Sequence, residues 1–263
     1  MANAITKFKT YIALLDEVYK QASLTADLDS DPTLVKAGAN ANEIIIPKIS
    51  MDGLADYSRS SGYVKGDVTL TNETVTFNYD RGRKFSVDNM DNEETAGVAF
   101  GKLSSEFIRT KSAPEQDAFR FATYAGTTGI SKVATGATLA TGNDVLAALV
   151  TAQNKMDEDE MSPENRILYI TPTLYNLAIN VDTTKSKAVL DGFAKIVKVP
   201  QSRFYTAIDL KDGTTKSDGV DETAGGFAKA TTAKDINFMI IQKSAVIQYP
   251  KHTVNKVVTP EEI

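Results

Sequence analysis

The sequence predicts an α+β protein, because segments with helical and with strand periodicity occupy separate stretches of the chain. Residues 5–22 carry apolar side chains three and four positions apart, which predicts an amphipathic helix. Residues 68–79 instead alternate between apolar and polar side chains, which is typical of a strand with one covered face. Residues 166–171 form a short apolar run followed by Pro172, which predicts a buried strand leading into a helix.

Length and composition set the first limits on function. The 263 residues can bury a substantial core in one large domain or two small ones. The net charge of −5 disfavours a dedicated nucleic-acid binder, which normally carries a basic excess or a basic face. The absence of cysteine excludes disulfides, thiolate nucleophiles and cysteine-ligated metals. Neither a secretory signal nor a run of roughly 20 apolar residues is found, so we expect a soluble protein.

The first 42 residues are predicted to form an arm. After the helix at 5–22, residues 23–42 contain turn signals around Pro32 and Gly38 and read as an extended connection. The helix could pack on a neighbouring molecule or fold back on its own domain, and the sequence leaves both open.

A long β-hairpin is predicted over residues 43–85. Segments 43–50 and 68–79 provide its strands, and a stretch rich in glycine, serine and charged residues forms the tip between them. An isolated two-stranded hairpin is marginally stable in water. Such an arm therefore needs another surface to lie on.

Helices are predicted to follow the hairpin. Residues 91–125 have helical spacing, with Asp91 or Asn92 as the N-cap. The sequence Ser-Ala-Pro-Glu at 112–115 matches a capping box, so either a second helix starts there or one long helix is kinked at Pro114. A further helix is predicted over 143–156, with Asn143 as its cap.

The last hundred residues predict further strands around a polar loop. Alternation at 203–210 indicates one strand, and residues 211–234 are predicted to be an exposed loop. The apolar segment 237–249 predicts another strand, and 254–258 a last one.

The sequence contains no good match to a catalytic or metal-binding motif. The chain's only histidine, His252, has no G-x-S-x-G motif to accompany it, and neither nucleotide-binding glycine motif is present. The carboxylates at 157–160 fit a solvated helix end better than a glycosidase site. The best candidate for a metal site is the acidic cluster of Asp88, Asp91, Glu93 and Glu94. This cluster lacks the turn glycine of a calcium-binding loop. We therefore expect no catalytic residue, no metal and no cofactor.

A small basic cluster follows the second strand of the hairpin. Arg81, Arg83 and Lys84 lie between Tyr79 and Phe85 in the sequence. Arginine suits ion pairing with acidic groups of a neighbouring subunit, and ordinary surface charge is an equal alternative.

The hairpin region also resembles a known family, the major capsid proteins of tailed bacteriophages and prophages, which share the Hong Kong 97 fold. The resemblance rests on one run of residues: Asp56, Tyr57, Ser58, Arg59, Gly62, Tyr63, Gly66, Glu73, Thr74, Asp80, Arg81, Gly82, Arg83, Phe85, Val87, Asp88, Met90, Asp91, Glu93 and Glu94. It implies four parts: an N-terminal arm (1–42), an extended loop (43–85), a peripheral domain with a long spine helix (86–142 and 235–263) and an axial α/β domain (143–234).

The resemblance further implies a structural protein rather than an enzyme. Such a protein self-assembles through pentamers and hexamers into an icosahedral head around double-stranded DNA, in the cytoplasm of a bacterial host. Scaffolding, portal and decoration proteins are further expected partners, with no sequence-specific DNA contact and no membrane. The subunit-interface candidates are Arg59, Tyr63, Lys65, Arg81 and Arg83, of which Lys65 is also the residue to examine for a Lys–Asn crosslink.

Two alternatives remain. An encapsulin-like nanocompartment shell protein has the same fold and encloses enzymes instead of DNA. A cytosolic hydrolase using paired carboxylates is more remote, since it needs a deep acidic cleft.

Overall fold

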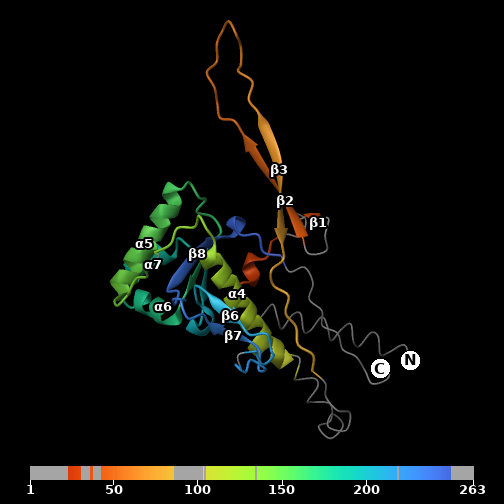
Figure 1. Ribbon diagram of the computed structural model, residues 1–263. Coiled ribbons are helices and arrows are strands. Elements are labelled where there is room, and N and C mark those ends of the chain that lie inside the picture. Colours follow the sequence, from red (N-terminus) through yellow and green to blue (C-terminus); the bar gives the residue numbers. More distant parts are fainter. Residues whose placement is uncertain are drawn as a thin grey trace, which may run out of the picture. The chain divides into compact units, whose positions relative to one another are not determined.

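The computed structural model describes part of the chain, and this part is of the α+β class (Figure 1). The described residues are 23–30, 36–37, 43–85, 103, 105–133, 135–217 and 219–249. The helix predicted at 5–22, the N-cap at 91 or 92, the acidic cluster at 88–94, His252 and the strand predicted at 254–258 lie outside them.

The chain divides into two units. The hairpin unit comprises Ser30–Ser86, and the larger unit comprises Met1–Asp29 and Val87–Ile263. The further division of the larger unit into peripheral and axial domains stays a prediction.

Three antiparallel strands make up the sheet of the hairpin unit, in the order β1-β2-β3. Strand β1 (Lys36–Ala37) is short and pairs only with the start of β2 (Glu43–Met51). Strand β3 (Val68–Thr76) pairs with the whole of β2. Both predicted hairpin strands are therefore confirmed, although the second ends at Thr76 and not at residue 79.

The central sheet of the larger unit has the order β5-β4-β8. Strand β4 (Arg166–Ile170) runs parallel to β5 (Lys195–Lys198) and antiparallel to β8 (Phe238–Gln242). All five residues of β4 are buried, which confirms the predicted buried strand and fits a strand covered on both faces. Strand β8 falls in the predicted peripheral segment, yet it pairs along its length with β4 of the predicted axial segment.

Alternate side chains of β4 enter two different hydrophobic clusters. Ile167 and Tyr169 join the cluster that contains Phe121 of helix α4 (Ala113–Gly126). Leu168 and Ile170 join the other cluster, on the side of α5 (Gly142–Glu158), α6 (Pro172–Ile179) and α7 (Thr183–Leu190) (Figure 1). The sheet is thus a middle layer between α4 and the three other helices.

Helix α5 (Gly142–Glu158) starts earlier than the sequence predicted. Its N-cap is Thr141, whose hydroxyl accepts a hydrogen bond from the Asp144 N–H at 3.3 Å, while the Asp144 carboxylate accepts one from the Thr141 N–H at 2.9 Å. Hydrogen bonds from Thr141 hold the pKa of Asp144 below its usual value. The prediction of Asn143 as cap was wrong because this reciprocal capping box uses the acid at 144.

The helix before α5 is continuous through Pro114, so the predicted capping box is wrong. Ser112 is helical and makes no side-chain cap bond. A π-helical turn, Ile108–Ser112, leads directly into α4, and the Ala113 N–H donates to the carbonyl of Ile108. This widened turn accommodates the proline, which lacks an N–H to continue the α-helical ladder.

Two shorter helices lie with α5 on the same side of the sheet. Helix α6 (Pro172–Ile179) begins at its proline, as the sequence predicted. Helix α7 (Thr183–Leu190) was not predicted, although Asp182 caps it by accepting a hydrogen bond from the Thr184 N–H at 2.8 Å.

Three predictions for the C-terminal region need correction. The strand expected at 203–210 is limited to β6 (Ile208–Leu210), because a 3₁₀ turn, Gln201–Arg203, covers its start and Tyr205 forms only an isolated bridge with Asp235. The expected loop contains β7 (Phe227–Lys229), which pairs with β6. The strand expected over 237–249 ends at Gln242, whose side chain accepts from the Ser244 N–H and starts a 3₁₀ turn.

Candidate functional site

Among the described residues, no group of three or more histidines and acidic residues could hold a metal ion. The carboxylates at the end of α5 are exposed and form ion pairs: Asp157 with Arg166 at 2.7 Å and Asp159 with Lys155 at 2.8 Å. This arrangement is the solvated helix end that the sequence favoured over a paired-carboxylate site.

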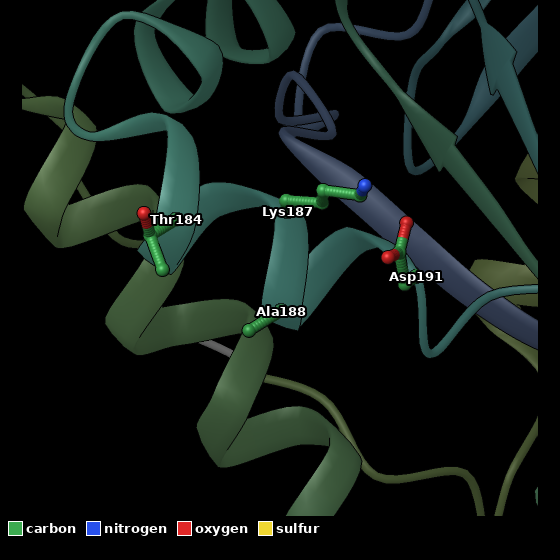
Figure 2. A pocket seen from close by; sticks show the side chains of 4 residues that line it. All are labelled: Thr184, Lys187, Ala188 and Asp191. Atoms are coloured by element: carbon green, nitrogen blue, oxygen red, sulfur yellow. The ribbon is translucent and has the colours of Figure 1, made fainter.

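The surface hollow of about 400 Å³ beside α7 contains little chemistry (Figure 2). Its lining residues are Thr184, Lys187, Ala188 and Asp191, which all come from α7 or the residue after it. The only charged groups among these lining residues are the ammonium of Lys187 and the carboxylate of Asp191. A binding or active site normally has several polar groups, from different elements, that point to one place, and these lining residues do not provide them.

Within the part of the chain that the structure describes, no helix is both long and apolar enough to cross a membrane.

The hairpin exposes most of its residues. From Pro47 to Thr76 every residue is exposed except Ser58 and Gly62, which are half-buried. The covered face predicted for the second strand is not found among the described residues, since all nine positions of β3 are exposed. Ile44 near the start of β2 is the one buried residue of the hairpin.

A tight turn and an aromatic pair organise the tip. The Ser58 N–H donates to the Gly62 carbonyl at 3.2 Å, and the Gly62 N–H donates back at 2.7 Å. Gly62 has φ 76°, a left-handed conformation that favours glycine. The rings of Tyr57 and Tyr63 then meet with centroids 4.9 Å apart, although 87% of Tyr63 remains exposed.

The five predicted interface residues form two separate groups. Arg59, Tyr63 and Lys65 lie at the tip, between the end of β2 and the start of β3, and all three are exposed. Arg81 and Arg83 follow the other end of β3. The structure therefore does not bring the five together into one site.

An exposed apolar face of the hairpin was missed in the sequence. The strand register places Ile49 opposite Leu70 and Met51 opposite Val68. Because alternate residues of a strand face the same side, these four side chains share one face. They are 63–71% exposed. The alternation in the sequence indicated a strand face, but only the register between strands identifies these four as neighbours.

The larger unit contains a buried polar network that also escaped the sequence. Asp117 of α4 is fully buried and accepts hydrogen bonds from the hydroxyls of Ser23 and Thr25, at 2.8 and 2.7 Å. It also pairs with Arg203 at 3.2 Å, and Arg120 donates to the Thr25 hydroxyl at 2.8 Å. The network fixes the segment after the predicted N-terminal helix onto α4.

The C-terminal part of the described chain joins the same network. The amide of Gln248 donates to the Thr25 carbonyl at 3.1 Å and to the Asp29 carboxylate, and its oxygen accepts from the Tyr124 hydroxyl. Burial raises the pKa of Tyr124, so the hydroxyl keeps its proton and remains a donor. Charged residues on the buried stripe of α4 were the available signal: Asp117 and Arg120 have the same helical spacing as Ala113, Phe121 and Tyr124.

Comparison with known proteins identifies no relative: no protein-family model matches the sequence, and no curated protein matches it either.

Proposed function

We propose that this chain is a shell-forming structural protein: the major capsid protein of a tailed bacteriophage or prophage, with a fold of the Hong Kong 97 type. It assembles through pentamers and hexamers of itself into an icosahedral head around double-stranded DNA. One observation carries the proposal, namely the hairpin at 43–85, which is exposed along nearly its whole length. A two-stranded ribbon of this kind needs a covering surface, and a neighbouring subunit in a shell supplies one.

The larger unit supports this proposal by having a core that does not depend on the hairpin. Both hydrophobic clusters consist entirely of residues from the larger unit. The hairpin is therefore free to serve as a contact element between subunits. Many weak contacts of this sort add up in a closed shell, because each closed contact raises the effective concentration for the next.

The resemblance of the run from Asp56 to Glu94 to phage capsid proteins gives the proposal its specific form. The encapsulin-like alternative predicts the same hairpin contacts but a protein cargo in place of DNA. The contents of purified particles, measured by nuclease sensitivity and mass spectrometry, separate the two. The hydrolase alternative has weaker support, because the described carboxylates at 157–160 are exposed and do not line a cleft.

Shortening the hairpin is expected to abolish particle formation while leaving the larger unit folded. Ile46 and Glu73 face each other across the ribbon, so a two-residue Asn-Gly turn can replace residues 47–72. The removed residues add nothing to either hydrophobic cluster, so the thermal midpoint should move by less than about 4 °C. Circular dichroism measures the midpoint, and sedimentation velocity measures the particles. Particles of unchanged size from the shortened chain would contradict the proposal.

A further inference from the structure

The distal half of the hairpin has two chemically different faces. One carries Ile49, Met51, Val68 and Leu70 as two directly opposed pairs. The other carries Lys48, Ser50, Thr69 and Thr71, and Lys48 forms an ion pair with Glu73, which stands opposite Ile46 one step closer to the base of the hairpin. Toward the base, the second face carries Ile44, Ile46 and Val75, but in the distal segment all four aliphatic side chains lie on the first face. A segment that meets solvent on both sides has no physical reason to gather them there. The apolar face is therefore the one that becomes covered.

The size of this face indicates what kind of partner covers it. Each of its four aliphatic side chains is smaller than an aromatic one, which buries roughly 150–250 Å². Even at about 150 Å² each, the four together would bury about 600 Å², less than the roughly 800 Å² that each partner contributes to a standard two-body interface. A single docking event on this face would thus be weak. The contact becomes stable when it is repeated around a closed ring of identical subunits, where every copy provides one hairpin and one receiving surface.

The distribution of charge permits docking on a second copy of the chain. The hairpin unit, Ser30–Ser86, has seven acidic and seven basic residues, so its net charge is zero. The chain as a whole has a net charge of −5, so the larger unit carries all of it. Two larger units repel one another, whereas the neutral hairpin approaches an acidic copy without this repulsion.

We infer that the hairpin docks onto a second copy of this chain through the face formed by Ile49, Met51, Val68 and Leu70, with the face of Lys48 and Glu73 directed to solvent. This inference rests on the proposed function and adds to it the side of the hairpin that makes the contact. The interface candidates predicted from the sequence, Arg59, Tyr63, Lys65, Arg81 and Arg83, lie outside this face.

Two adjacent single-cysteine variants of the full-length chain test the inference. The chain has no cysteine, so Leu70→Cys and Thr71→Cys each introduce a unique thiol. The two positions are neighbours on β3, both exposed, and point to opposite faces. Each variant is reacted with a fluorescent maleimide before and after assembly, and light scattering follows particle formation in the same samples. Val68→Cys and Thr69→Cys form a second pair of the same design.

In unassembled chains, we expect the two thiols of each pair to react at similar rates. In particles, labelling at 70 and 68 should slow by about tenfold or more, while labelling at 71 and 69 should change by less than about twofold. An apolar-face variant that fails to assemble while its neighbour assembles leads to the same conclusion. Equal labelling on both faces of assembled particles would overturn the inference and leave shell formation standing. A chain that never assembles would overturn both.

Discussion

Replacing Asp117 with alanine is expected to lower the free energy of unfolding of the larger unit by about 3–5 kcal/mol. The carboxylate is fully buried and paired with Arg203, so its removal leaves a largely buried guanidinium without this counter-charge. The hydroxyls of Ser23 and Thr25 and the N–H of Leu24 lose their acceptor at the same time. Denaturant titration followed by circular dichroism measures the loss.

The matched control for this variant is Asp235→Ala. Asp235 also forms an ion pair with a basic residue, Lys229 at 2.7 Å, but its side chain is 54% exposed. An exposed pair contributes about 1 kcal/mol or less, so this control should unfold at nearly the wild-type denaturant concentration. If the two variants lost the same small amount of stability, the buried network would not hold the N-terminal segment on α4 as described.

Adding one methyl group at Gly142 is expected to destabilise the protein by about 3 kcal/mol, at the upper end of the range for overpacking. A Cβ at this position would lie 2.2 Å from a methyl of Val181 and 2.3 Å from the carbonyl oxygen of Leu177. The carbonyl belongs to the backbone of α6 and cannot rotate away. The clash therefore outweighs the gain of about 1 kcal/mol that alanine normally brings over glycine inside a helix.

Gly126→Ala tests whether this loss comes from the clash. Gly126 is the last residue of α4, and a Cβ there would meet nothing within 4 Å. The variant should keep wild-type stability or gain up to about 1 kcal/mol. A Gly142→Ala protein that unfolds together with Gly126→Ala would show that α5 and α6 can move apart at low cost, contrary to the packing seen here.

Local signals in the sequence were sufficient for some elements. The hairpin strands followed from period-2 alternation and β-branched residues, and β4 and α6 from an apolar run ending at Pro172. Each of these patterns is complete within about ten residues, so no long-range information was needed.

Other elements depend on contacts that a sequence does not display. The run 237–249 is rich in apolar residues, but only the five residues opposite β4 form a strand, because β4 itself is five residues long. Phe121 is fully buried, with its ring centroid 5.2 Å from that of Tyr169 and 4.9 Å from that of Phe204, and both partners come from distant parts of the sequence. Asp117 and Arg120 lie on the same stripe of α4 as Phe121, and charged residues at these positions are normally typical of an exposed helix face.

The apolar face of the hairpin also depends on contacts that the sequence does not display. The resemblance and the enrichment of arginine and tyrosine at interfaces gave candidates at the tip and beyond the base of the hairpin, namely Arg59, Tyr63, Lys65, Arg81 and Arg83, and these stay predictions. The apolar face became visible only when the register set Ile49 against Leu70. A shift of the register by one residue would have moved one strand's side chains to the opposite face.

The mass of the particles formed by the purified full-length chain tests the central claim most directly. Multi-angle light scattering combined with negative-stain imaging is expected to find closed shells, tubes, or rings of five and six subunits of 28.4 kDa each. A protein that keeps the mass of one 28.4 kDa subunit at every concentration, with and without a crowding agent, would contradict the account.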